Sequence, residues 1–314
     1  MSDRARPARR AAPPRVIVTK VRPPRRRRDF LTRDRLNAYI GDNLERKLLL
    51  VSAPAGYGKT SLLVDYAQKS GLPVCWYTLD PQDCDPVAFL EHLIEAIRQR
   101  FSGTCLRTQE LLRSQVEDGK LDLSDIVGSL VNEIDESIDS FFLLILDDYQ
   151  NVDDSDEVNQ TLDLLLRYLP DACQLVISGR SVPRKLTLTR LVGAGQVAGV
   201  GQEQLRFTPP EIGRLVSDLH GRQLSEMECE RLARESEGWV TALVMAGPRM
   251  LDGVRTAMPE REQLFAFLAD EVLDTTELTP HELRAEVASR FGTTELALPM
   301  VVRCESFGFR FGLP

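Results

Sequence analysis

The stretch that decides the fold is VSAPAGYGKTSLLVDYA, residues 51–67. It overlaps an apolar run, KLLLVSA (47–53), that is typical of a strand buried on both faces of a parallel sheet. After the glycines the pattern becomes amphipathic and predicts a helix from about Gly58 to Ser70. Two interpretations are open at this point: a loop that surrounds a phosphate group, or a plain glycine-rich turn between a strand and a helix.

The spacing of residues 53–61 favours the phosphate loop, because a small residue and four others precede Gly58-Lys59-Thr60. The two glycines permit positive φ and close approach of a ligand, and the helix N-terminus adds free N–H groups. Lysine suits the β- and γ-phosphates, and the threonine hydroxyl suits Mg²⁺. The motif usually begins with glycine, and the alanine found here is acceptable if its φ is negative. The predicted phosphate cradle consists of Ala53, Pro54, Ala55, Gly56, Tyr57, Gly58, Lys59, Thr60 and Ser61.

An acidic pair follows the most hydrophobic predicted strand, FFLLILDD (141–148). We expect this strand to neighbour the strand of the cradle, with Asp147 at its carboxyl edge holding the water shell of Mg²⁺ together with Thr60. An acidic turn that merely ends a strand is the alternative, and the presence of the cradle favours the Mg²⁺ site. Asp148 stands where many ATPases have a glutamate that polarises water. Because aspartate is one methylene shorter, we expect a poor general base, or only a residue of the Mg²⁺ shell or a sensing residue, and slow hydrolysis suited to a switch.

Arg180 ends another predicted strand, CQLVISGR (173–180). If that strand lies beside the Asp147 strand, the guanidinium group lies near the γ-phosphate and can report whether ATP or ADP is bound. The alternative is an exposed arginine at the end of a strand. The predicted catalytic set is Lys59, Asp147, Asp148 and Arg180.

Strands alternating with helices of about 10–15 residues predict an α/β fold, a P-loop NTPase with a doubly wound parallel sheet. The expected strands are 47–53, 74–80, 141–148, 173–180 and 205–207. Thr32 is the expected N-cap of a helix over about 33–44, and Thr208 with Glu211 forms a capping box that opens an all-helical part. The predicted domains are a basic, proline-rich arm (1–28), the NTPase domain (29–207), a helical, winged-helix-like region (208–285) and an atypical tail (286–314).

The charge of the chain is uneven along its length. The net charge is −8, but the arm has eleven basic residues and one acidic residue, so the rest of the chain is strongly acidic. An acidic body is a poor surface for nucleic acid. The arm is either solvated, or docked on the protein itself, or in contact with an anion such as the nucleotide or a nucleic acid. No apolar run is long enough to span a membrane and no secretory signal is visible, so the predicted location is cytoplasmic, with no membrane partner.

Seven segments together resemble the N-terminal ATPase module of MalT-like, LuxR-family transcriptional regulators of the STAND class. The resemblance covers roughly residues 15–275. The segments are TKVRPPRRRRDFLTRDRL (19–36), VSAPAGYGKTSLLVDYA (51–67), WYTLDPQDCDPVAFLEHLIEAI (76–97), LLILDDYQNV (143–152), LVISGR (175–180), LRFTPPEI (205–212) and EGWVTAL (237–243).

The resemblance implies an ATP/ADP switch. ADP would hold a closed monomer, whereas ATP with an inducer would allow self-association. It also implies that the helical part closes over the nucleotide, and that Lys20 and Arg27 of the arm lie near it. The preference for adenine over guanine comes from the family, since the chain has no guanine-specifying N/T-K-x-D.

The chain departs from the family pattern at its end. Family members continue into a helical sensor and a DNA-reading helix-turn-helix, whereas residues 286–314 fit that continuation poorly. We therefore expect a truncated or frame-shifted product that contacts DNA only through domains absent from this chain. Two alternatives are open: a stand-alone P-loop ATPase or kinase with ordinary turnover, and a non-catalytic interaction fragment.

Overall fold

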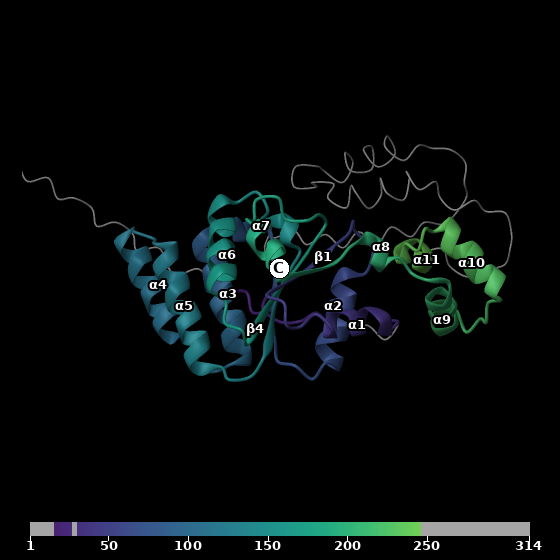
Figure 1. Cartoon of the computed structure of the whole chain (residues 1–314), viewed down its shortest axis with the longest axis horizontal. Coiled ribbons are helices and arrows are strands. Elements are labelled where there is room, and N and C mark those ends of the chain that lie inside the picture. The colour runs from purple at the N-terminus through teal and green to yellow at the C-terminus, as the bar shows by residue number, and fades with distance from the viewer. Residues whose placement is uncertain (1–15, 27–29, 246–314) are drawn as a thin grey trace, which may run out of the picture. The chain divides into compact units, whose positions relative to one another are not determined.

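The computed structural model describes residues 16–26 and 30–245. Its centre is a parallel sheet with helices packed around it (Figure 1). The sheet has five strands in the order β2-β3-β4-β1-β5. The strands are β1 (Leu48–Ser52), β2 (Val74–Thr78), β3 (Phe142–Asp147), β4 (Cys173–Gly179) and β5 (Val197–Val200). The parallel α/β class predicted from the alternating pattern is confirmed.

Helices alternate with the strands, as the sequence pattern predicts. They are α1 (Asp34–Gly41), α2 (Lys59–Lys69), α3 (Pro86–Arg100), α4 (Leu106–Asp118), α5 (Leu123–Ser137), α6 (Asp156–Tyr168), α7 (Thr189–Gly193) and α8 (Gln202–Leu205). Two short 3₁₀ turns, η1 (Pro81–Cys84) and η2 (Tyr149–Asn151), follow β2 and β3. Among the described residues, none of the helices has the length and apolar character that crossing a membrane would require.

The main hydrophobic core consists of residues from the sheet and from helices α3 to α6. Every second strand residue points into it, including Leu48 and Leu50 of β1 and Leu144 and Leu146 of β3. The residues between them, such as Leu49, are also buried, on the face of the sheet that α2 covers through its contacts with β4. Burial on both faces explains why these strands read as continuous apolar runs.

Residues 209–245 form a helical module that follows the sheet, with helices α9 (Pro209–His220), α10 (Glu226–Glu235) and α11 (Val240–Met245). A smaller core joins them and includes Phe207, Ile212 and Leu232. The predicted capping box is present where α9 begins, since the Thr208 N–H donates to the Glu211 carboxylate at 2.9 Å. The predicted domain boundary near residue 208 stays a prediction. The predicted tail at 286–314 lies outside the described residues.

Two local predictions are wrong, and one strand was missed. Residues 205–207 form no strand, because α8 ends at Leu205 and Phe207 makes only an isolated bond, from its N–H to the Gly238 carbonyl. The fifth strand is instead β5, a four-residue segment with two small residues and little apolar signal. Thr32 is not the N-cap of α1. Arg33 occupies that position, and the Thr32 hydroxyl donates to Asp65 of α2.

Candidate nucleotide-binding site

The loop between β1 and α2 has the backbone shape that the glycine spacing predicts. Gly56 and Gly58 take φ values of +78° and +80°, in the left-handed region that favours glycine. Ala53 is not among the described residues with positive φ, so its methyl group is unstrained. Gly58 caps α2, and the first turn of that helix contains Lys59, Thr60 and Ser61. The cradle therefore ends in free helix N–H groups, as a phosphate site requires.

Lys59 is folded back onto its own loop. Its Nζ donates to the carbonyls of Ala53 at 2.8 Å and Pro54 at 3.2 Å, and the residue is buried. Burial lowers the pKa of Lys59, Asp147 and Asp148 oppose that shift, and the charge of Arg180 adds to it. The ammonium group is thus held by backbone carbonyls, and it forms no ion pair within 4 Å with a carboxylate of the described chain.

Thr60 of α2 and Asp147 of β3 are in contact, although β3 is not the neighbour of β1, the strand that leads into α2. The Thr60 Oγ1 donates to the Asp147 Oδ2 at 2.7 Å. The prediction that the Asp147 strand neighbours the cradle strand is wrong, because β4 lies between β3 and β1. The contact forms all the same, because α2 reaches across the carboxyl edge of the sheet. The condition set for Arg180 is met, since β4 lies beside β3, and its role at the γ-phosphate stays a prediction.

Asp147 is almost completely buried, and only one of its two carboxylate oxygens, Oδ2, accepts a hydrogen bond of good geometry. Its Oδ1 and the buried Ser178 hydroxyl on the next strand each lack a hydrogen bond of good geometry in the described part of the chain, although Ser178 and the Asp148 N–H lie near enough to lower the pKa of Asp147. Burial raises the pKa of Asp147, and the charge of Asp148 raises it further. A buried carboxylate oxygen without a donor is an unusual and costly arrangement, and a metal ion or its water shell would relieve it.

Asp148 and Arg180 flank this centre and share one partner. Asp148 has a φ of +60°, which is uncommon for a residue other than glycine. Gln150 joins the two residues: its Nε2 donates to Asp148 Oδ1 at 3.0 Å, and its Oε1 accepts from the Arg180 N–H at 3.2 Å. The Arg180 residue is exposed at the end of β4. Gln150 was not predicted, although it lies in the quoted LLILDDYQNV segment.

Residues of the helical module contact the cradle from outside. The Trp239 Nε1 donates to the Ala55 carbonyl at 3.1 Å, and the Thr241 Oγ1 donates to the Gly56 carbonyl at 3.0 Å. The side chain of Tyr57 is fully buried, and its hydroxyl accepts from Gln202 of α8 at 2.9 Å. Sequence reasoning identified EGWVTAL only as part of a resemblance, because nothing local links it to a loop that lies far away in the sequence.

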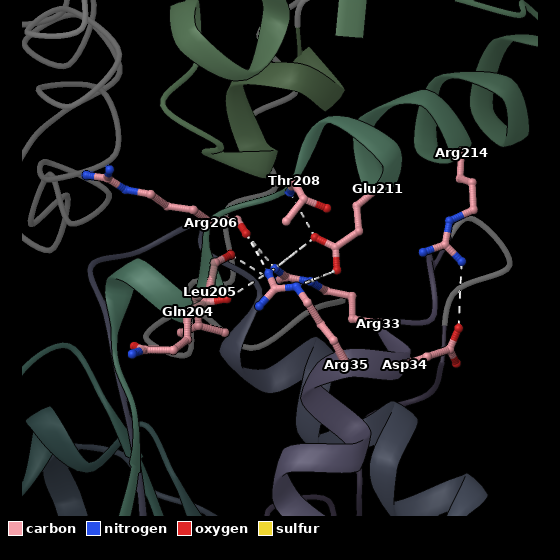
Figure 2. Close-up of polar contacts among 9 residues, drawn as sticks. All are labelled: Arg33, Asp34, Arg35, Gln204, Leu205, Arg206, Thr208, Glu211 and Arg214. Carbon is pink, nitrogen blue, oxygen red and sulfur yellow. Dashed lines mark hydrogen bonds and ion pairs between the residues drawn. The ribbon is translucent and has the colours of Figure 1, made fainter. Parts of the chain in front are cut away.

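A second charged cluster, the latch, ties the start of α1 to the connector between α8 and α9 (Figure 2). Arg33 is buried and donates to the carbonyls of Leu205 and Arg206, both at 2.8 Å, and to both carboxylate oxygens of Glu211. Arg35 donates to the same two oxygens from a more exposed position. The Arg33 guanidinium also stacks on Phe207, 4.3 Å from the ring centroid. The latch was not predicted, since arginines in an arginine-rich segment give no signal of burial.

The arm residue Lys20 does not lie free for a nucleotide. Its Nζ binds Asp83 at 2.5 Å and Asp80 at 3.1 Å, beyond the end of β2, the edge strand of the sheet. Its carbonyl accepts from the Thr78 N–H at 2.8 Å. This part of the arm is therefore docked on the protein itself. Arg27 and residues 1–15 lie outside the described residues.

Two curated relatives match most of the chain. It is 30% identical over 268 residues to the HTH-type transcriptional regulator MalT of Serratia proteamaculans (strain 568), and equally to that of Yersinia pestis (strain Pestoides F). Each match covers 82% of this chain and 29% of the relative, so the chain spans less than a third of the length of these regulators. This chain belongs to the family of N-terminal ATPase modules of MalT-like regulators.

Two other comparisons add little to the MalT-like assignment. No protein-family model matches the chain. Among solved structures, the Walker-type ATPase of Pyrococcus abyssi has 17% identity and a TM-score of 0.46, covering 85% of this chain and 79% of that one. Domain III of the Thermotoga maritima replication initiation protein DnaA has 18% identity and a TM-score of 0.37, covering 75% and 89%. Likeness at this level carries no information on activity.

The residues of the MalT-like module fit a nucleotide with Mg²⁺. The loop has two positive-φ glycines and a helix N-terminus for phosphate, and Lys59 supplies a buried positive charge. Thr60 and Asp147 would hold Mg²⁺, and the unpartnered Asp147 Oδ1 is the oxygen that such an ion would satisfy. The bound ion would neutralise phosphate charge.

Proposed function

We propose that this module is a nucleotide switch of a transcriptional regulator. It binds ATP or ADP with Mg²⁺, hydrolyses ATP slowly, and self-associates in the ATP form. The observation that carries the proposal is the Thr60–Asp147 pair at the cradle, with one buried Asp147 oxygen left without a donor. A structural ion pair or hydrogen-bond network would satisfy that oxygen, whereas a site built for a cation leaves it available.

The proposed roles follow from position. Lys59 binds the phosphates, Thr60 and Asp147 hold Mg²⁺, and Arg180 senses the γ-phosphate from the end of β4. Slow hydrolysis is supported by Asp148, whose short side chain is already engaged by Gln150 and whose backbone is in the left-handed region. Such a residue is poorly placed to move toward an attacking water. A cytoplasmic location belongs to the same proposal.

Nucleotide affinity tests the cradle. Calorimetric titration with ATP and Mg²⁺ should give binding in the parent chain and none in Lys59→Ala. Lys69→Ala is the matched control, because Lys69 is on the same helix but half exposed at its far end. Equal affinity of the parent and Lys59→Ala would refute the assignment of residues 53–61 as the cradle.

Turnover and size test the switch. We expect steady-state hydrolysis well below about 1 s⁻¹, the lower end of the usual enzyme range. Faster turnover would refute the switch and favour an ordinary ATPase or kinase. Light scattering should give a larger mass with a non-hydrolysable ATP analogue than with ADP. The same mass in both states would exclude nucleotide-controlled self-association for this chain.

A further inference from the structure

The start of α11 touches the backbone of the cradle and leaves no spare room. Besides accepting hydrogen bonds from Trp239 and Thr241, the loop approaches both side chains so closely that a Cβ on Gly56 would lie 2.4 Å from the Thr241 Oγ1 and 2.6 Å from the Trp239 Nε1. Glycine at position 56 is therefore required twice, by its positive φ and by this contact. We call Trp239 and Thr241 the clamp.

The clamp determines where two N–H groups of the cradle point. No cis peptide occurs among the described residues, and in a trans peptide the carbonyl and the following N–H point in opposite directions. Trp239 holds the Ala55 carbonyl, so it also fixes the direction of the Gly56 N–H. Thr241 holds the Gly56 carbonyl and in the same way fixes the Tyr57 N–H. Neither N–H donates to another described residue.

The latch keeps the clamp in place. Arg33 binds the carbonyls of Leu205 and Arg206 and the side chain of Glu211, which together span the connector into α9. The Phe207 N–H in that connector donates to the Gly238 carbonyl at 2.8 Å, next to Trp239. A Cβ on Gly238 would lie 2.7 Å from the Phe207 nitrogen, so this approach is also close. A continuous set of packed backbone contacts thus connects α1, the connector and the clamp.

We propose that Trp239 and Thr241 are positioning residues of the phosphate cradle. From the helical module, they hold the Ala55 and Gly56 carbonyls outward, so that the Gly56 and Tyr57 N–H groups face the phosphates of the bound nucleotide. The helical module is thereby part of the phosphate site without touching the ligand. This inference rests on the proposed function, because it concerns how the same site binds its nucleotide.

A positioning role differs from a structural one in what it predicts for ligands. If the clamp only stabilises the fold, its loss lowers stability and affects all ligands alike. If it orients N–H groups toward phosphate, its loss lowers the affinity for ATP and ADP. The affinity for adenosine, which has no phosphate, stays unchanged. Affinity for the three ligands therefore separates the two roles.

The experiment compares Thr241→Val with Thr241→Ser and Thr161→Val. Valine keeps the shape of threonine but removes the hydroxyl, whereas serine keeps it. Thr161 is the matched control, since its hydroxyl also donates to a backbone carbonyl, that of Glu157 at 2.8 Å, within α6 in the main core. A lost neutral hydrogen bond should weaken ATP and ADP binding about 3- to 10-fold in Thr241→Val. Adenosine affinity should stay the same, and serine should restore ATP affinity.

Fluorescence gives a second readout at the other clamp residue. The chain has two tryptophans, Trp76 and Trp239, and Trp76 is buried in β2 with its Nε1 bonded to Thr78. ATP should change the emission of the parent chain, and the change should vanish in Trp239→Phe. Adenosine should cause no change. A response that persists in Trp239→Phe would come from Trp76 and would contradict the proposal.

The outcomes separate failure of the inference from failure of the proposed function. If the parent chain does not bind ATP with Mg²⁺, the proposed function fails, and the inference with it. If the parent binds but Thr241→Val binds ATP as tightly as Thr161→Val does, the inference alone fails. The inference also fails if Thr241→Val loses adenosine and ATP affinity in equal proportion.

Discussion

Two buried carboxylates in this molecule have opposite surroundings. Glu211 of the latch accepts hydrogen bonds from Arg33, Arg35 and the Thr208 N–H. Asp147 of the cradle accepts one from Thr60 and has a second oxygen without a partner in the described chain. Both are at most 2% exposed, so burial alone does not distinguish them.

The pKa values of the two groups move in opposite directions. Burial disfavours the charged form of Glu211, but the Thr208 N–H and the arginines together hold its pKa below the ordinary value. For Asp147, burial and the charge of Asp148 raise the pKa, and the Thr60 hydroxyl, with the Ser178 hydroxyl and the Asp148 N–H nearby, does not compensate. The comparison teaches that the latch is complete without a ligand, whereas the cradle is not. Stability is expected from the first and binding from the second.

The largest expected effect on stability comes from breaking the latch. Arg33→Met should lower the free energy of unfolding by about 3–5 kcal/mol, because it removes one partner from a buried ion pair. Arg35→Met is the matched control: it faces the same Glu211 but is 39% exposed, so its loss should cost less than about 1 kcal/mol. Urea denaturation of both variants measures the difference. Equal losses would mean that burial of Arg33 does not matter to the latch.

At Asp147, where one carboxylate oxygen lacks a donor, a substitution should raise the free energy of unfolding instead of lowering it. Asp147→Asn should raise the free energy of unfolding by about 1 kcal/mol without Mg²⁺, because the neutral amide avoids an unsatisfied buried charge. It should also abolish the dependence of ATP affinity on Mg²⁺. Asp153→Asn is the control, since Asp153 is similarly buried but already accepts from the Arg184 N–H at 3.3 Å. That control should lose stability, and a loss in Asp147→Asn as well would contradict the comparison.

The smallest expected effect is in the pH dependence of unfolding. Because the pKa of Glu211 is lowered in the folded chain, its stabilisation is present above the unfolded pKa of about 4.3 and is lost as pH falls through the folded value. Glu211→Gln should therefore show a shallower loss of stability between about pH 5 and pH 3 than the parent chain. Chemical denaturation across that range measures the slope. An unchanged slope would mean that Glu211 titrates alike in both states.

The sequence predicted well what depends on local pattern. The cradle, the buried strands and α6 at residues 156–168 came from spacing and periodicity, which are properties of a few consecutive residues. The capping box at Thr208 and Glu211 was predicted for the same reason. β5 was missed because four residues with two small side chains give almost no apolar signal.

Partners were predicted less well than elements. Asp147 was assigned to the right edge of the sheet but to the wrong neighbour, because strand order is not encoded in any short segment. The Lys20 side chain was expected near the nucleotide and pairs with Asp80 and Asp83 instead. Arg33 and Arg35 of the latch lie beyond the predicted arm and were given no role, since charge in a sequence does not reveal burial.

The sequence by itself determined that a strand, a glycine loop and a helix follow one another with the spacing of a phosphate loop, because backbone freedom at Gly56 and Gly58 and the spacing to Lys59 are local properties. Only the tertiary structure decided which groups complete it. Thr60 meets Asp147 across an intervening strand, and Trp239 and Thr241 reach the loop from 184 and 185 residues away. Such contacts form only when the sheet order and the packing of separate helices are fixed, and those depend on the whole chain.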